Sequence, residues 1–94
     1  MLKILVIEDD ELIRETLVEL LESHSYRVIV AENGRFGVQM ALAEIPDLIL
    51  CDVQMPEIDG YDVLRTLRQN SLAATIPFIF LTAQSAKTDF RRGM

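Results

Sequence analysis

Short apolar runs alternate with segments of helical periodicity along this chain, and this alternation strongly limits the folds it can adopt. The runs are rich in Val, Ile, Leu and Phe, and they are Ile4–Ile7, Val28–Ala31, Leu48–Cys51 and Phe78–Leu81. Three of them lack polar alternation, which is typical of strands covered on both faces. Strands that alternate with helices form a parallel sheet with right-handed crossovers. The sequence therefore predicts an α/β fold with the order β-α-β-α-β-α-β-α.

The segments between the runs have the spacing of amphipathic helices. The first predicted helix carries Glu and Arg on one face, and its other face is apolar and consists of Leu12, Ile13, Leu17, Leu20 and Leu21. Asn33 has the residue type of an N-cap for the second helix. Val63, Leu64 and Leu67 indicate a third helix, and Lys87–Met94 is predicted to begin a fourth.

Composition limits the chain to one domain with a buried core. Half of its 94 residues are hydrophobic and the formal net charge is −6. Arg91-Arg92 is the only adjacent basic pair, so we expect no nucleic-acid binding by this chain. Cys51 is the only cysteine, which excludes an intrachain disulfide and fits a reducing compartment. No run approaches the roughly 18 apolar residues of a membrane span, so a cytoplasmic protein without membrane contact is predicted.

Acidic residues follow two of the predicted strands at the point where each ends. Glu8, Asp9 and Asp10 come directly after the first strand, Asp52 ends the third, and Thr82 ends the fourth. In an open parallel sheet, functional groups gather beyond the carboxyl ends of the strands. If the first and third strands are neighbours, Asp9 and Asp52 converge there. Either Glu8 or Asp10 is then expected to point inward beside them.

Crowded carboxylates repel one another and stay ionised together when a cation offsets their charge. Mg²⁺ suits this need, because it prefers oxygen ligands and typically binds one or two carboxylates, waters and a phosphate. The ion would also assist phosphoryl transfer, in which a carboxylate attacks phosphorus to form an acyl phosphate. A backbone carbonyl in the loop 53–60 could complete the metal site. The Thr82 hydroxyl could bond a phosphoryl oxygen on Asp52.

Three segments of the chain resemble response regulator receiver domains, the CheY-like modules of two-component signalling. They correspond to the first strand with its acidic pair, the phosphoacceptor strand with its loop, and the fourth strand with its switch threonine, and they are Ile4–Asp10, Pro46–Gly60 and Ile76–Ala83. The resemblance covers the whole chain. It implies a flavodoxin-like, doubly wound parallel sheet with strand order 2-1-3-4.

The resemblance also implies a role for individual residues. Asp52 would be the phosphoacceptor and Thr82 the switch hydroxyl. Asp9 and Asp52 would bind Mg²⁺ directly, with the backbone carbonyl of Gln54, and Glu8 would help through a water molecule. The implied protein is a signalling phosphoacceptor rather than an enzyme. It would take its phosphoryl group from a histidine kinase or a phosphotransfer protein and then change partners.

Members of this family also carry a fifth strand and a fifth helix, with a lysine at the end of that strand. This sequence ends at Met94 without them. We therefore expect the receiver domain at 1–94 to be incomplete at its C-terminus, either as a fragment or as a unit that folds with a partner. A C-terminal output domain, a homodimer, and phosphorylation without the lysine all stay open.

Plainer interpretations apply to several of these residues. The acidic turn after the first strand could serve only to cap a helix, and Asp10 has the residue type for that position. Cys51 precedes Asp52 along a strand, so it faces the opposite side and is expected to be inert in the core. His24 is expected at the surface, where the first helix ends.

Other functional classes also compete. A receiver-shaped binding module that does not cycle phosphate would fit the absent lysine. A haloacid-dehalogenase-like phosphatase uses an aspartate nucleophile and Mg²⁺, but it needs a second aspartate two residues on, where Glu11 stands here. A nucleotide-binding enzyme needs a glycine-rich loop after the first strand, and this sequence has none.

Overall fold

The computed structural model describes residues 1–81, so Thr82 and the predicted fourth helix lie outside the described residues. Strands and helices alternate along the chain, in the order β1 (Lys3–Ile7), α1 (Glu11–Ser23), β2 (Arg27–Ala31), α2 (Gly34–Glu44), β3 (Leu48–Asp52), α3 (Gly60–Arg68) and β4 (Phe78–Leu81). The four predicted strands and three predicted helices within this range are confirmed. Strand boundaries differ from the prediction by no more than one residue.

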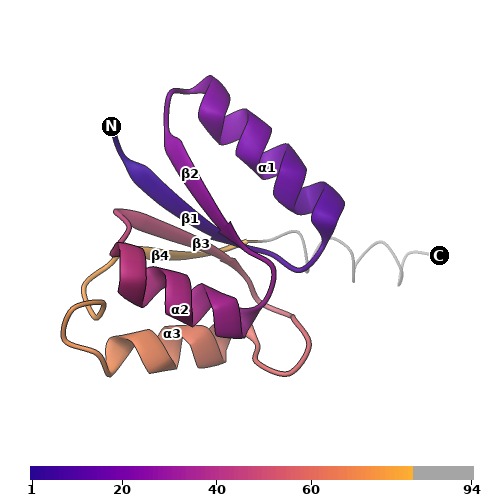
Figure 1. The fold of residues 1–94 in the computed structure, drawn as a ribbon. Helices are drawn as coiled ribbons and strands as arrows, with labels where there is room; N and C mark the ends of the chain where they lie inside the picture. Colours follow the sequence, from indigo (N-terminus) through magenta and orange to yellow (C-terminus); the bar gives the residue numbers. More distant parts are fainter. Residues whose placement is uncertain (82–94) are drawn as a thin grey trace.

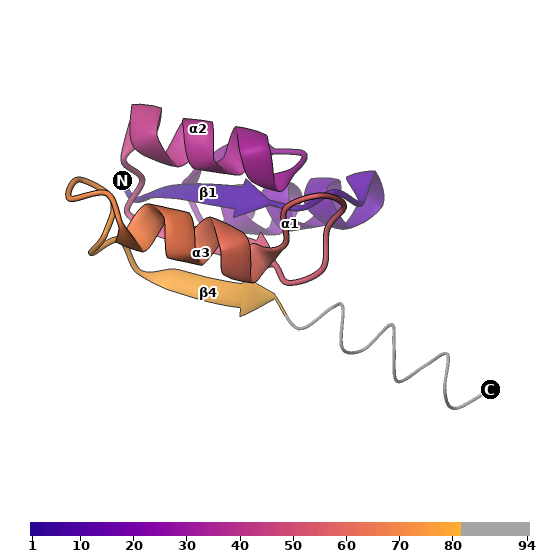
Figure 2. The same cartoon turned by 90° about the horizontal axis from the view of Figure 1, so that it is seen from below.

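The strands form one parallel sheet in the order β2-β1-β3-β4, as predicted. Helix α1 lies on one face of the sheet, and α2 and α3 lie on the other (Figures 1 and 2). The register pairs Ile7 of β1 with Ala31 of β2 and with Cys51 of β3. The carboxyl ends of three strands are therefore level, and the residues that follow them emerge at one edge of the sheet.

The main core lies between the sheet and the helices α2 and α3. Alternate strand residues point into it, and buried residues from both helices meet them: Leu5, Ile7, Ile49, Cys51, Ala41, Val63 and Leu67. Gly37 allows α2 to approach β1 closely, because a Cβ there would lie 2.6 Å from Cδ1 of Ile7. Gly60 begins α3 where a Cβ would collide with the backbone carbonyl oxygen of Asp52.

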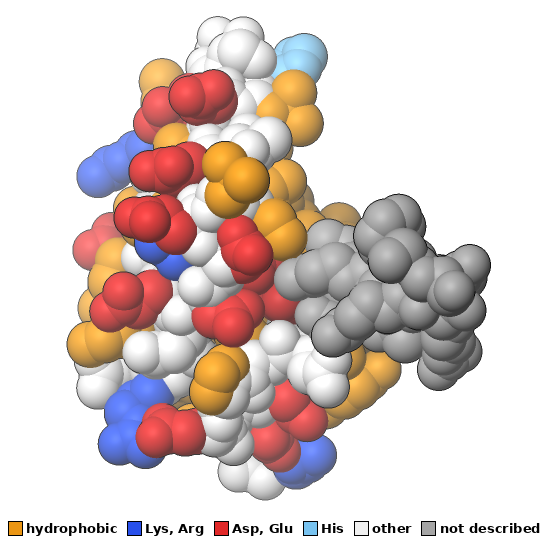
Figure 3. Space-filling model, turned by 90° about the vertical axis from the view of Figure 1, so that its right-hand side faces the viewer, with side chains coloured by type: hydrophobic (Ala, Val, Ile, Leu, Met, Phe, Trp, Pro, Cys, Tyr) orange, Lys and Arg blue, Asp and Glu red, His pale blue; other side chains and the backbone are white. Residues whose placement is uncertain are grey.

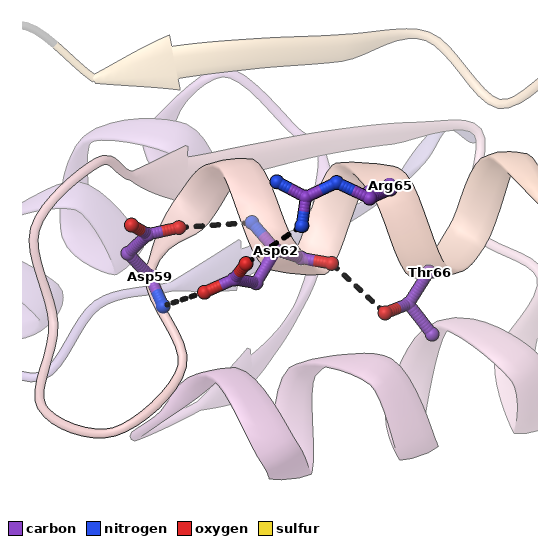
Figure 4. Close-up of polar contacts among 4 residues, drawn as sticks. All are labelled: Asp59, Asp62, Arg65 and Thr66. Atoms are coloured by element: carbon purple, nitrogen blue, oxygen red, sulfur yellow. Dashed lines mark hydrogen bonds and ion pairs between the residues drawn. The ribbon is translucent and has the colours of Figure 1, made fainter.

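Side-chain caps begin each of the three helices found in the described part of the chain. Asp10 accepts a hydrogen bond of 3.0 Å from the Ile13 amide, and Asn33 accepts one of 2.8 Å from the Phe36 amide. Both caps agree with the sequence prediction. The cap of α3 was missed, and it is a capping box in which Asp59 and Asp62 each accept the other's backbone N–H (Figure 4).

Helix α1 differs from its predicted packing. None of its residues is buried, and Leu12 and Leu20, both expected on the apolar face, are 72% and 54% exposed. The partly covered apolar residues form a narrower stripe, which consists of Ile13, Leu17, Val18 and Leu21. A single helix covers this face of the described sheet, so it makes contact along one stripe only. None of the helices within residues 1–81 is long and apolar enough to cross a bilayer.

Candidate functional site

Three carboxylates meet at the carboxyl edge of the sheet. One oxygen from each of Glu8, Asp9 and Asp52 lies within 4.8 Å of the other two. Glu8 directly follows β1 and Asp52 ends β3, and the level register of these neighbouring strands brings them together. Many acidic side chains lie on the face of the molecule that Figure 3 shows. The predicted convergence of Asp9 and Asp52 is therefore confirmed.

The three carboxylates differ in exposure. Glu8 and Asp52 are fully buried, whereas Asp9 is exposed. Oε2 of Glu8 accepts a hydrogen bond of 3.0 Å from the Asp10 amide, while Oε1 has no donor within reach among the described residues. Of the two residues that flank Asp9, Glu8 points inward and Asp10 caps α1. The spacing of the acidic residues left this choice open, and the resemblance to receiver domains implied Glu8 for the site and Asp10 for the cap.

The electrostatics of the cluster are those of a site that suits a cation. Burial, opposed by the hydrogen bond from the Asp10 amide and assisted by the charge of Asp52, raises the pKa of Glu8 from 4.5 to about 7. A buried carboxylate oxygen without a donor, beside two more carboxylates, offers an all-oxygen ligand set. A hard divalent cation such as Mg²⁺ fits such a set.

Arg14 supports the turn that carries the cluster. Its Nη1 donates a hydrogen bond of 2.9 Å to the backbone carbonyl oxygen of Glu8, across the turn between β1 and α1. Helical periodicity predicts Arg14 on the polar face of the first helix and indicates no role for it. An arginine in the first turn of a helix that follows an acidic turn is the sequence signal that could have predicted this contact.

The loop after β3 carries Gln54, the third predicted metal ligand. Gln54 is exposed and lies two residues beyond Asp52. The loop folds back on itself, and the Gly60 amide donates a hydrogen bond of 2.8 Å to the carbonyl oxygen of Val53. Glu57 within the loop has a positive φ of 68°. Gln54 is close to the cluster along the chain, and the role of its backbone carbonyl as a metal ligand stays a prediction.

Two residues with plainer predicted roles also have clear positions. Cys51 is fully buried in the core, as expected, and its Sγ donates to the carbonyl oxygen of Asp52 at 3.3 Å. Burial, followed by the charges of Asp52 and Glu8, raises the pKa of its thiol to about 12. His24 is exposed at the C-terminal end of α1, as predicted.

Comparison with known proteins gives the family. The family model described as the response regulator receiver domain matches residues 4–94 of this chain. The chain belongs to the response regulator receiver domain family. Receiver domains are signalling modules of two-component systems, which act with histidine kinases and output domains, and they bind Mg²⁺ in an acidic pocket. The three carboxylates of this receiver domain form an acidic cluster at the carboxyl edge of the sheet.

Individual relatives agree with the family. This receiver domain is 36% identical to Protein PilH of Pseudomonas aeruginosa over 89 residues, which are 95% of this chain and 74% of PilH. It is 39% identical to the transcriptional regulatory protein YxdJ of Bacillus subtilis, covering 93% of this chain but 37% of YxdJ. The receiver domain of the Pseudomonas aeruginosa sensor histidine kinase PA1611, solved with a magnesium ion in its active site cleft, superposes with a TM-score of 0.85. It is 31% identical and the match covers 96% of this chain and 74% of that one.

Proposed function

We propose that this receiver domain is a phosphoacceptor whose Asp52 takes a phosphoryl group from a histidine kinase or a phosphotransfer protein. The observation that carries the proposal is the meeting of Glu8, Asp9 and Asp52 at the carboxyl edge of the sheet, within 4.8 Å of one another. Membership of the receiver domain family supports the same assignment. The protein then acts as a signalling switch rather than as an enzyme with a separate substrate.

Asp52 is the nucleophile in this proposal. One of its carboxylate oxygens forms a bond to phosphorus, the P–N bond of the donor's phosphohistidine breaks, and the imidazole leaves with the electron pair. Because Asp52 ends β3, which pairs with β1 on one side and β4 on the other, its backbone is held in a fixed position. Such fixed positioning of the nucleophile is what phosphoryl transfer chiefly demands of a protein.

Glu8, Asp9, Asp52 and the backbone carbonyl of Gln54 would hold Mg²⁺ beside the phosphoacceptor. Asp9, Asp52 and Gln54 are proposed as direct ligands and Glu8 as a ligand through water. The buried Oε1 of Glu8, without a donor among residues 1–81, supports a cation here. When bound, the ion would neutralise negative charge on the carboxylates and on the transferring group. The magnesium ion in the related PA1611 receiver domain supports this assignment.

The remaining roles follow from the same proposal. Thr82 would be the switch hydroxyl that senses the phosphoryl group, directly after the last described strand residue. Phosphorylation would change the partners of a cytoplasmic protein, either through a homodimer or through an output domain. An output domain is proposed because this chain spans 37% of the regulator YxdJ.

Transfer of a phosphoryl group from acetyl phosphate in the presence of Mg²⁺ tests the proposal. Intact-mass measurement is expected to show one added phosphoryl group, which is lost on treatment with hydroxylamine. Asp52→Asn is expected to abolish the label. Asp10→Asn is the matched control, because Asn is an equally good N-cap and Asp10 lies outside the cluster. Equal labelling of the Asp52→Asn protein would end the proposal, and a folded protein that never labels would favour the binding module without phosphate chemistry.

A further inference from the structure

The outer edge of β2 is an unprotected strand edge. β2 stands first in the sheet and, within residues 1–81, pairs only with β1. Its centre is the β-branched run Val28, Ile29 and Val30, and the strand contains neither proline nor lysine; its one charged residue, Arg27, stands at its first position. Proteins usually protect such edges with proline, lysine or bulges, because unpaired backbone groups there can pair with another chain. An edge without these features can accept a further strand.

The backbone groups of two residues point outward from this edge. The Arg27 amide and the Ala31 carbonyl both take part in hydrogen bonds toward β1, at 2.9 and 3.1 Å. Backbone groups alternate in direction along a strand of a parallel ladder. The N–H and C=O groups of Val28 and Val30 therefore face away from the sheet, where an added strand would meet them.

Two adjoining hollows flank the edge, and Arg14 and Val30 line both of them. One has a volume of about 240 Å³ and extends toward Phe36 and Met40 of α2. The other has a volume of about 420 Å³ and extends along Val18 of α1, beside two glutamates. Val30 and Phe36 are 42% and 47% exposed, so their apolar surface is open to a ligand.

The two sides of the edge differ in chemistry. The side of α1 carries Glu15 and Glu19 beside Arg14, whose guanidinium donates to the Glu8 carbonyl, so its net charge is negative. The side of α2 offers the apolar surfaces of Phe36 and Met40. The two helices lie on opposite faces of the sheet (Figure 1). A strand added to β2 would direct its side chains alternately to these two faces. It would fit best with basic residues toward α1 and apolar residues toward α2.

We propose that the β2 edge is a docking surface for an extended segment of a partner protein in which basic and apolar residues alternate. Its backbone pairs with Val28 and Val30, its apolar side chains contact Phe36 and Met40, and its basic side chains meet the glutamates of α1. A second copy of this chain fits less well, because each copy carries a net charge of −6 and the same glutamates. The surface uses none of the carboxylates of the phosphoacceptor site.

Titration of the ¹⁵N-labelled protein with a synthetic peptide of alternating Val and Lys tests the proposal. The amides of Val28, Val30 and Glu32 are expected to shift and to saturate. A peptide of the same composition with its lysines and valines in separate blocks is expected to bind about tenfold more weakly. Equal binding of the two peptides, or shifts confined to other regions, would overturn the proposal.

Variants at the edge locate the binding. Val30→Pro removes an outward N–H without removing a hydrogen bond to β1, and it is expected to weaken the alternating peptide by about tenfold or more. Val30→Lys is expected to do the same by charge repulsion. Leu72→Lys adds the same charge at a position that is 69% exposed and lines neither hollow, so it is expected to bind normally. Equal loss in both lysine variants would contradict docking at this edge. Self-association of the peptide-free protein through the same amides would instead identify a second copy as the occupant.

Discussion

The guanidinium group of Arg14 donates a hydrogen bond to the backbone carbonyl of Glu8, with 2.9 Å between the two atoms. The contact joins the first turn of α1 to the residue that leads from β1 into the acidic cluster. It fixes the turn in which Glu8 and Asp9 stand next to each other and face Asp52. Arg14 therefore positions the site through the backbone without belonging to it.

Loss of this contact is expected to loosen the cluster. We predict that Arg14→Met lowers the free energy of unfolding by about 1 kcal/mol, since one hydrogen bond from a partly exposed cation is lost. Magnesium affinity, measured by calorimetry, is expected to fall on the order of tenfold, as for other residues that orient metal ligands. Arg35→Met is the matched control, because Arg35 is exposed and its one ion pair within residues 1–81 is with the exposed Glu57 at 3.6 Å. Equal magnesium affinity in both variants would contradict a positioning role.

Stability without metal is expected to depend on pH through Glu8. Its pKa is raised to about 7 in the folded protein from the ordinary value of 4.5. The folded state therefore holds a proton that the unfolded state has released, so stability is fully present below about pH 4.5 and falls as pH rises toward about 7. The shift corresponds to at most about 3 kcal/mol.

Urea unfolding in the presence of a chelator would measure this dependence. Glu8→Gln keeps the shape without the charge, and its stability is expected to change less across the same pH range. Added Mg²⁺ is expected to stabilise the wild-type protein more at pH 8 than at pH 5, since the cation favours the ionised carboxylate. Identical pH profiles of stability for the wild type and Glu8→Gln would show that Glu8 is not the source of the pH dependence.

The start of α3 is expected to accept no side chain larger than hydrogen. We predict that Gly60→Ala costs about 3 kcal/mol or more, because its Cβ would collide with the backbone carbonyl oxygen of Asp52. Gly37→Ala is a useful comparison, since the three atoms nearest to its Cβ would all be side-chain atoms of Ile7, which can move. Its expected cost is about 1 to 2 kcal/mol. Urea unfolding measures both, and a smaller loss for Gly60→Ala than for Gly37→Ala would contradict the order.

The capping box of α3 gives a local prediction. Asp59→Ala removes the acceptor of the Asp62 amide, at 2.9 Å, and is expected to cost about 1 kcal/mol (Figure 4). Asp59→Asn retains an acceptor and is expected to cost less. Thr66→Val removes the exposed bond from its hydroxyl to the Asp62 carbonyl, and a change within about 0.5 kcal/mol is expected. Equal costs at Asp59 and Thr66 would show that the cap contributes little.

The alternation of strands and helices, and the convergence of Asp9 and Asp52 if the first and third strands are neighbours, could be predicted because they depend on regular features of the chain. Unbroken apolar runs indicate buried parallel strands, and parallel strands bring the residues that follow them to one edge. The resemblance to receiver domains then supplied the strand order. The caps Asp10 and Asn33 followed from residue type alone.

Other features depend on the surroundings of a residue rather than on its type. The inward direction of Glu8 is decided by the turn that Arg14 and the Asp10 amide hold. The exposure of Leu12 and Leu20 reflects how α1 packs on the sheet. Helical periodicity predicts which face of a helix is apolar, but it does not predict how much of that face the sheet covers. The roles of Gln54 and Thr82 stay predictions.

Because Ile7 of β1 pairs with Cys51 of β3, the positions of the acidic side chains depend on the number of residues in β1. Successive side chains of a strand point to opposite faces, so one residue inserted within β1 would move Glu8 to the place of Asp9 and Ile7 to the place of Glu8. It would also turn the buried apolar residues beyond the insertion to the opposite face of the sheet. The placement of the acidic side chains and the packing of the core therefore depend on the same strand register. Neither can shift along β1 without the other, so a change of one residue in the length of this strand would alter both the acidic cluster and the core.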